Sequence, residues 1–286
     1  MFLLSGFSDE ISSDIKVQFE VLNKLNISYF EPRGINGKNI SELNDDEIKI
    51  LKENMEKYNI KASSIGSPIG KVKLSDDFDK HFELFKHIVK IAKKLGTRYI
   101  RIFSFYNGGE EWTEEMIKTV IERLRMMISY AKENEVILLH ENEKDIFGDS
   151  VERCLYLMEN LYCDNFKALL DPANFVQCDE DTITAFEKLK PYIGYVHIKD
   201  SLKEDKSIVP AGKGDANIEY ILKSLYENGY DGFLSLEPHL GSFEGLKDLE
   251  LDNAMLKLPK GGEGTFTAAH NALNKILERI TEAQNG

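Results

Sequence analysis

Cysteine is scarce in this sequence, and the three residues present form no recognised site. Cys154, Cys163 and Cys178 make an odd set, and none of them shows the CxxC spacing of zinc-binding motifs. Such a set suits free thiols in a reducing compartment. The cysteines therefore point away from a zinc or disulfide scaffold and predict a cytoplasmic protein.

Long hydrophobic runs are missing as well. No stretch approaches the roughly 20 apolar residues that are needed to cross a bilayer. The first ten residues, MFLLSGFSDE, lack the basic start and the long apolar core of a secretion signal. The sequence thus predicts no membrane contact and no export.

Positive charge is in deficit. The chain has 36 Lys and Arg against 49 Asp and Glu, which gives a net charge of −13. A protein this acidic repels phosphodiester backbones unless it carries a concentrated basic groove, and no basic run indicates one. Nucleic acid is therefore not expected as a partner. The 42% of hydrophobic residues is instead typical of a protein with a large buried core.

Strand-like and helix-like patterns alternate along the whole chain. Apolar residues recur every three or four positions over 78–95 and 114–132, which predicts amphipathic helices, and Gly96 supplies a stop after the first. Eight strand-like runs accompany such helices: 2–6, 28–32, 61–66, 98–105, 136–142, 166–172, 195–200 and 233–238. Eight alternations in a chain of 286 residues predict an α/β fold, a single-domain (β/α)8 TIM barrel over residues 1–286.

The spacing becomes irregular after the eighth strand. Residues 239–264 are rich in glycine and charge and are longer than an ordinary loop between a strand and a helix. We expect this segment to be either a lid over the site or a contact between subunits, followed by a closing helix over 265–282.

Metal-binding side chains close the last four strand-like runs: Glu141, Asp171, His197 and Glu237. Parallel strands bring their carboxyl ends to one rim of a barrel, so these four side chains can meet around one ion. Carboxylates with one imidazole suit Mn2+, Mg2+, Co2+ or Zn2+. Each residue alone could equally be a strand-end cap or a surface charge, but four in succession predict a metal site.

Further polar residues near the strand ends are candidates for substrate binding. Lys199 shares the face of His197 and could stabilise a sugar oxygen or an enediolate. Asn174 could bind substrate or form an Asx-turn. Glu31 ends the second strand and Arg101 lies near the end of the fourth, where either could line the pocket or form an ion pair.

The GKGD segment at 212–215 follows the seventh strand, where barrels often bind phosphate. This position makes Lys213 a further candidate for substrate binding. A lone GxG does not specify a phosphate site, however, and we favour a plain turn leading to a helix capped by Asn217. His140 should face away from Glu141 because strand side chains alternate, and His239 could return to the rim.

Several motifs together carry a family resemblance: FSDEIS near the start, HEN (140–142), LLDPANF (169–175), VHIKD (196–200), PAGKGD (210–215) and LSLEPH (234–239). With them the chain resembles the xylose-isomerase-like TIM barrels, a family of sugar phosphate isomerases and epimerases. The resemblance implies one divalent ion, Mn2+ foremost, held by Glu141, Asp171, His197 and Glu237. It also implies that Glu141 and Glu237 form the acid/base pair, and that the protein is a homodimer or homotetramer.

Two departures refine the resemblance. The epimerases commonly carry His three residues after the Asp, where this chain has Asn174. The abasic-site endonucleases of the same fold need several extra histidines that this sequence lacks, which points away from repair nucleases. The sequence therefore predicts a sugar isomerase or epimerase that transfers protons through a cis-enediolate on a small keto-sugar or related polyol. The alternatives are a metal-dependent dehydratase of a keto-cyclitol or related acid, and a sugar- or metal-binding barrel without turnover.

Overall fold

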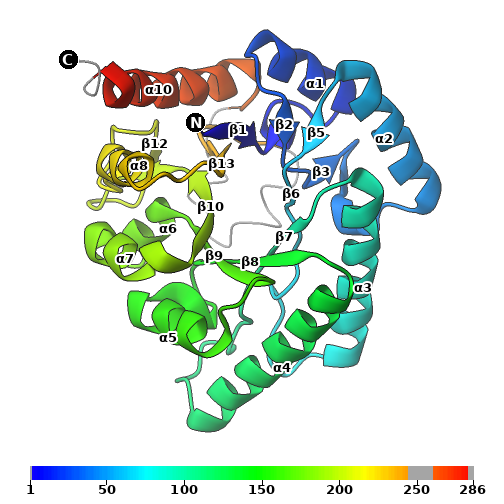
Figure 1. Ribbon diagram of the computed structural model, residues 1–286, viewed down its shortest axis with the longest axis vertical. Coiled ribbons are helices and arrows are strands. Elements are labelled where there is room, and N and C mark those ends of the chain that lie inside the picture. The colour runs from blue at the N-terminus through cyan, green and yellow to red at the C-terminus, as the bar shows by residue number, and fades with distance from the viewer. Residues whose placement is uncertain (1, 244–259, 283–286) are drawn as a thin grey trace.

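The strands form a ring in the computed structural model, which describes residues 2–243 and 260–282 (Figure 1). Seven strands pair in parallel in the order β1-β13-β10-β9-β8-β7-β6. Their bounds are β1 Leu3–Gly6, β6 Ser64–Ile65, β7 Tyr99–Ile102, β8 Ile137–Glu141, β9 Phe166–Leu170, β10 Ile193–Ile198 and β13 Phe233–Leu236. The predicted (β/α)8 TIM barrel is confirmed.

The second strand position completes the ring. β2 (Tyr29–Phe30) pairs in parallel with β5 (Lys61–Ala62), which runs on into β6 past Ser63. On the other side, the Glu31 amide donates to the Gly6 carbonyl at 2.9 Å and so joins β2 to β1. The predicted strand at 28–32 is shorter than expected because Pro32 has no N–H to donate and the chain turns into β3 (Gly34–Ile35) and β4 (Lys38–Asn39).

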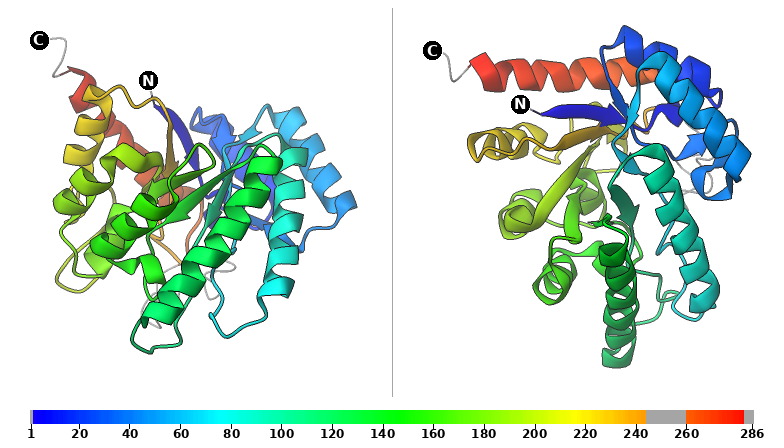
Figure 2. Two further views of the ribbon diagram at one scale, coloured as in Figure 1. Left: turned by 60° about the horizontal axis from the view of Figure 1, so that its bottom comes forward. Right: turned by 45° about the vertical axis from the view of Figure 1, so that its right-hand side comes forward.

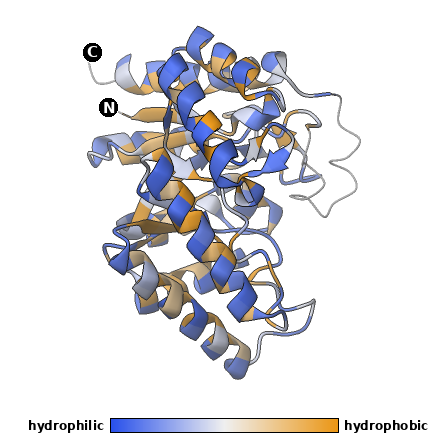
Figure 3. Cartoon of the chain, turned by 90° about the vertical axis from the view of Figure 1, so that its right-hand side faces the viewer, coloured by the Kyte–Doolittle hydropathy of each residue, from blue (hydrophilic) through white to orange (hydrophobic). Residues whose placement is uncertain are grey.

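Helices surround the strands on the outside (Figures 1 and 2). They are α1 Ile15–Lys24, α2 Asp45–Tyr58, α3 Phe78–Leu95, α4 Glu114–Glu133, α5 Val151–Leu161, α6 Pro172–Gln177, α7 Thr182–Leu189, α8 Ile218–Glu227 and α10 Glu263–Glu282. Hydrophilic and hydrophobic stripes run side by side along them (Figure 3). None of the helices in 2–243 and 260–282 has the length and apolar character that crossing a membrane requires.

Helix α3 shows how local sequence sets the boundaries. The Asp77 side chain accepts the Lys80 amide and caps the first turn, and Gly96 with a φ of +77° ends the last. Its buried face includes Phe85, Ile88 and Ala92, which belong to the large core between helices and strands. The helix therefore covers residues 78–95, as predicted.

The interior of the barrel has a separate small apolar cluster. Ile137, Leu139, Leu169 and Tyr195 pack together there, while their sequence neighbours Leu138 and Val196 join the outer core. His140 likewise points outward and is buried beside Phe166, as predicted. Odd-numbered residues in the carboxyl-terminal halves of β8, β9 and β10 thus face inward, which decides the direction of the side chains at the ends of these strands.

Residues 244–259 of the predicted lid or subunit contact lie outside the described residues. At the base of that segment, Ser242 forms a parallel bridge with Lys260, and the Gly261 amide donates to the Ser242 carbonyl at 2.7 Å. The closing helix follows directly as α10 and begins two residues earlier than expected. The two ends of the segment are therefore joined beside the last strand.

Candidate metal centre

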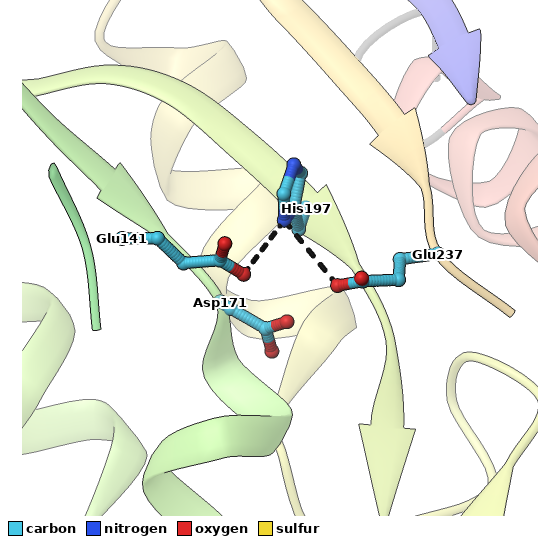
Figure 4. A group of neighbouring side chains, drawn as sticks. All are labelled: Glu141, Asp171, His197 and Glu237. Carbon is cyan, nitrogen blue, oxygen red and sulfur yellow. Dashed lines mark hydrogen bonds and ion pairs between the residues drawn. The ribbon is translucent and has the colours of Figure 1, made fainter. Parts of the chain in front are cut away.

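The four predicted ligands meet at the carboxyl ends of neighbouring strands. Glu141 is the last residue of β8, Asp171 follows β9, His197 lies in β10 and Glu237 follows β13. One ligand atom from each residue lies within 4.8 Å of the ligand atoms of the other three. Figure 4 shows Glu141 and Glu237 approaching His197 from opposite sides, with Asp171 below them. The barrel thus brings together residues that are almost 100 positions apart in sequence.

The donor atoms fit a divalent cation. All four side chains are buried, with at most 3% of their surface exposed. Asp171 Oδ2 and Glu141 Oε2 are buried and accept no well-aligned hydrogen bond, and their polar neighbours are the cations Lys199 and Arg101. His197 Nδ1 lies 2.9 Å from Glu141 Oε1 and 3.4 Å from Glu237 Oε2. Three carboxylates and one imidazole around one point form an oxygen-rich ligand set that suits Mn2+, Mg2+, Co2+ or Zn2+.

Buried cations balance part of this negative charge. Lys199 Nζ lies 2.9 Å from Asp171 Oδ2 and 3.3 Å from Glu237 Oε2. Burial would lower the pKa of Lys199, but the carboxylates of Asp171 and Glu237 hold it well above its usual value. Lys199 is therefore an ammonium at neutral pH, placed inside the site as predicted from its shared face with His197.

The acids of the cluster differ in protonation. Burial raises the pKa of Asp171 to about 7. Burial also opposes ionisation of Glu237, but Lys199, His239 and His197 together hold its pKa well below its usual value. The pKa of His197 is raised well above its usual value because Glu141 and Glu31 outweigh the effect of burial. Glu237 is thus ionised at neutral pH, whereas Asp171 exchanges a proton in that range.

Asp171 is fixed by its own turn. It caps α6, and its Oδ1 accepts the Asn174 amide at 3.1 Å. The side chain of Asn142 exchanges two hydrogen bonds with the Asp171 backbone, at 2.8 and 2.9 Å. Asn174 Nδ2 donates to the Asn142 carbonyl at 2.9 Å. The Asn174 side chain is therefore engaged in joining the ends of β8 and β9, and Asn142 is a structural partner that the sequence analysis did not single out.

Two arginines lie beside the cluster. Arg101 Nη1 is 3.2 Å from Glu141 Oε2, and its guanidinium lies over the rings of Phe7 and Phe103. Arg33 donates to both carboxylate oxygens of Asp9 at 2.8 and 3.0 Å. It also reaches Glu237 Oε1 at 3.1 Å. Arg33 thus pairs with Glu237, whereas Arg101 pairs with Glu141 and, at 3.9 Å, also with Glu237.

The segment after the first strand contributes residues that sequence reasoning passed over. Asp9 holds Arg33, and Glu10 Oε2 accepts the His239 amide at 2.8 Å. Burial raises the pKa of Glu10 to about 7. The ring of His239 lies 3.5 Å from Glu237 Oε1, which puts His239 at the rim as expected. The FSDEIS motif was the available signal for Asp9 and Glu10.

The last two predicted substrate-binding residues, Glu31 and Lys213, do not face the point where the four ligand atoms meet. Glu31 contacts His197 Nε2, whereas Glu141 and Glu237 contact Nδ1. Lys213 is exposed on the loop at 210–216, and no contact joins it to the cluster within the described residues.

The backbone amides of the loop at 210–216 are bound by a carboxylate of the protein itself. Asp200 accepts the backbone N–H groups of Gly212, Gly214 and Ala216 at 2.8 to 3.0 Å, so its carboxylate takes the donors that a phosphate would need. The predicted side-chain cap by Asn217 is wrong. Asn217 has a φ of +56° and its Nδ2 donates to Thr182 Oγ1 instead.

The family model described as xylose isomerase-like TIM barrel matches residues 19–257. The chain belongs to this family. The match extends over the ends of β8, β9, β10 and β13, and so includes all four residues of the candidate metal centre.

Curated proteins that are similar to this chain are named for different reactions. A 3-dehydroshikimate dehydratase from Bacillus anthracis is 23% identical over 183 residues, which are 58% of this chain and 65% of the relative. An inosose dehydratase from Clostridium perfringens is 29% identical over 46% of this chain and 50% of its own length. A probable L-ribulose-5-phosphate 3-epimerase, UlaE, from Mycoplasma pneumoniae is 25% identical over 50% and 47%. The chain therefore matches about half to two thirds of the length of these relatives.

Solved structures share the fold over nearly the full chain. A D-tagatose 3-epimerase-like protein has a TM-score of 0.76 at 16% identity and covers 99% of both chains. The IOLI protein, whose structure has a bound zinc atom, has a TM-score of 0.74 at 20% identity and covers 98% of this chain and 99% of its own. These structures show that the chain shares its whole fold with an epimerase-like protein and with a zinc-containing protein.

Proposed function

We propose that this chain is a divalent-metal-dependent enzyme that transfers protons next to the carbonyl of a small polyhydroxylated substrate, as a sugar isomerase or epimerase. One observation carries this proposal: Glu141 and Glu237 approach the cluster from opposite sides, on strands that flank β9 and β10 (Figure 4). Two carboxylates facing one substrate can remove a proton and return one. The zinc atom bound in the IOLI structure, which has the same fold, supports a metal centre here.

A bound divalent ion supplies polarisation of the substrate carbonyl, which acidifies the neighbouring C–H group. The chain itself supplies the proton transfer. Glu237 is ionised at neutral pH because of the surrounding cations and can accept the proton. Glu141 can deliver a proton to the opposite face of the same carbon, which epimerises it, or to the neighbouring carbon, which isomerises the sugar.

Positively charged side chains beside the cluster can stabilise the negative charge that develops on an enediolate. Lys199 and Arg101 are buried cations within ion-pair distance of the acids, and we assign them to contact substrate oxygens. Asn174 holds the end of β8 in place, so we assign it a positioning role. Lys213 lies on an exposed loop whose backbone amides donate to Asp200. We therefore propose that Lys213 contacts a substrate only at the rim of the barrel.

Dehydration of a keto-cyclitol or related acid is the second candidate. The Lys199 ammonium lies 3.3 Å from Glu237 Oε2, so an acid stands directly beside the candidate base. Such a pair can remove an α-proton and assist the departure of a β-hydroxyl group. The relatives named as 3-dehydroshikimate and inosose dehydratases support this alternative. A barrel that binds sugar or metal without turnover is the remaining, non-enzymatic alternative.

Hydrogen exchange in deuterated water tests the common step. Mn2+-loaded protein is incubated with free ketoses, keto-acids and sugar phosphates, and carbon-bound hydrogen is followed by NMR. We expect exchange next to the carbonyl in the wild-type protein. We expect exchange to be about 10²- to 10⁴-fold slower in Glu237→Gln and Glu141→Gln, because each variant lacks one general acid or base.

Glu219→Gln is the matched control, since Glu219 is an exposed surface acid paired with Arg279. Exchange at a near-normal rate in Glu237→Gln would contradict the two-glutamate scheme. Formation of a conjugated product that absorbs in the ultraviolet would instead assign the dehydratase reaction. Absence of exchange and of product with metal bound would favour the non-enzymatic barrel.

A further inference from the structure

Glu31 lies beneath the candidate metal centre and is 1% exposed. Three donors converge on its Oε2 atom. Ser235 Oγ donates at 2.7 Å, Tyr195 OH at 3.1 Å, and His197 Nε2 lies at 3.1 Å. Glu31 therefore binds the side of the His197 ring that faces away from the other ligands.

Hydroxyl groups inside the barrel hold the carboxylate of Glu31 in place. Ser5 Oγ lies 2.6 Å from Ser63 Oγ, which lies 2.9 Å from Tyr195 OH. These residues and Ser235 come from β1, the junction of β5 and β6, β10 and β13. The hydroxyls of Ser235 and Tyr195 thus hold Glu31 directly, and those of Ser63 and Ser5 extend the network behind Tyr195.

We propose that Glu31 is a positioning residue of the metal centre and does not contact substrate. By accepting a hydrogen bond from His197 Nε2, it keeps the proton on that nitrogen and leaves the Nδ1 electron pair for the ion. It also fixes the plane of the ring, so that Nδ1 points to Glu141 and Glu237. The inference rests on the proposed metal centre and assigns to Glu31 a different role from the one predicted from sequence.

The affinity for Mn2+, measured by isothermal titration calorimetry, tests this role without reference to any reaction. We expect Glu31→Gln to bind Mn2+ about 10- to 100-fold more weakly than the wild-type protein, since loss of an outer partner of a metal-binding histidine costs this much affinity. Ser63→Ala is the matched control, because it removes a hydroxyl from the same buried network without touching Glu31. We expect its affinity to stay within about threefold of the wild-type value.

A second measurement reads the unmodified protein, and a variant is needed only to assign its signals. In the Zn2+-loaded protein with 15N-labelled histidine rings, NMR should show the proton of His197 on Nε2, with the signals assigned by their loss in His197→Gln. A proton on Nδ1 in that state would overturn the proposal.

The outcomes separate this inference from the proposed function. Equal Mn2+ affinity of folded Glu31→Gln and the wild-type protein would overturn the role of Glu31 alone. An equal loss in Ser63→Ala would attribute the effect to the buried network in general and would also overturn it. If the wild-type protein binds no divalent metal, the metal centre fails, and the inference fails with it.

Discussion

The buried acids of the site are each matched by a nearby cation. Glu141 lies beside Arg101, Asp171 beside Lys199, and Glu237 beside Arg33 and Lys199. Leaving such carboxylates unpaired in the interior would cost several kcal/mol each, so these pairs allow the cluster to exist before any ion binds. The same residues also set the proton equilibria on which metal binding depends.

Metal affinity should therefore rise with pH through neutrality. Burial raises the pKa of Asp171 to about 7, so below that pH a proton on Asp171 competes with the ion. The pKa of His197 is also raised, and its Nδ1 must lose a proton before it can bind metal, which extends the dependence to higher pH. We expect Mn2+ affinity to increase about tenfold or more per pH unit between pH 6 and 8, measured by calorimetry.

A matched control for this dependence is available at Asp179, an exposed acid near the start of α7. Asp179→Asn should reproduce the wild-type pH profile, whereas Asp171→Asn should bind weakly at every pH because a ligand is lost. An affinity that stays constant between pH 6 and 8 would contradict the assignment of Asp171 and His197 as proton-coupled ligands.

At the scale of single residues, the sequence predicted which four side chains meet, but it did not predict which other side chains contact them. Strand alternation and strand-end position suffice to bring Glu141, Asp171, His197 and Glu237 together. Arg33 donates hydrogen bonds to both Asp9 and Glu237. These contacts depend on the direction of the side chains, which cannot be read from the spacing of residues in the sequence. For the same reason the sequence left open whether Glu31 lines the pocket or forms an ion pair, since its position in sequence does not tell which edge of the His197 ring it meets.

At the scale of single elements, the loop at 210–216 shows how a buried carboxylate can organise a backbone. Asp200 accepts four amides, from Ser201, Gly212, Gly214 and Ala216. A Cβ atom at Gly214 would lie 2.3 Å from Asp200 Oδ1, so only glycine fits there. The loop is thus built around Asp200, the immediate neighbour of Lys199.

Replacing Asp200 with Asn should loosen this loop. The side chain of Asn has one acceptor oxygen in place of two, so some of the backbone amides that now donate to Asp200 lose their acceptor. Each buried unsatisfied group costs about 1–3 kcal/mol. We expect the free energy of unfolding to fall by roughly 2 kcal/mol and the amides of 212–216 to exchange with deuterium faster. Lys213→Ala is the control, because its exposed side chain should leave both measurements unchanged. Unaltered exchange in Asp200→Asn would show that other contacts hold the loop.

Helices were predicted more closely than strands, for reasons visible in the chain. Helix α3 has both a capping Asp77 and a terminating Gly96, so its sequence marks each end. The strand at 28–32 has no such signals, and only Tyr29 and Phe30 pair with Lys61 and Ala62. Whether further residues join a ladder depends on the neighbouring strand, which lies about 30 positions away in sequence.

At the scale of the whole molecule, the candidate metal centre joins consecutive strands of the ring. Its ligands come from β8, β9, β10 and β13, which are successive neighbours in the sheet. The segment from the start of β8 to the end of β13 covers residues 137–236, about a third of the chain. An ion held by all four would oppose separation of this part of the barrel, so its binding energy should appear as stability of the entire fold.

Removal of metal should therefore lower the unfolding temperature of the protein. A ligand at 100 times its Kd stabilises the folded state by about 2.7 kcal/mol, which corresponds to a rise in Tm of roughly 5 °C for a domain of this size. We expect differential scanning calorimetry of EDTA-treated protein to show this rise on addition of Mn2+, in a single transition. Asp171→Ala removes one ligand and should abolish most of the shift, whereas Glu219→Gln, an exposed surface substitution, should retain it. Equal Tm values with and without Mn2+ in the wild-type protein would contradict a metal centre shared by the four strands.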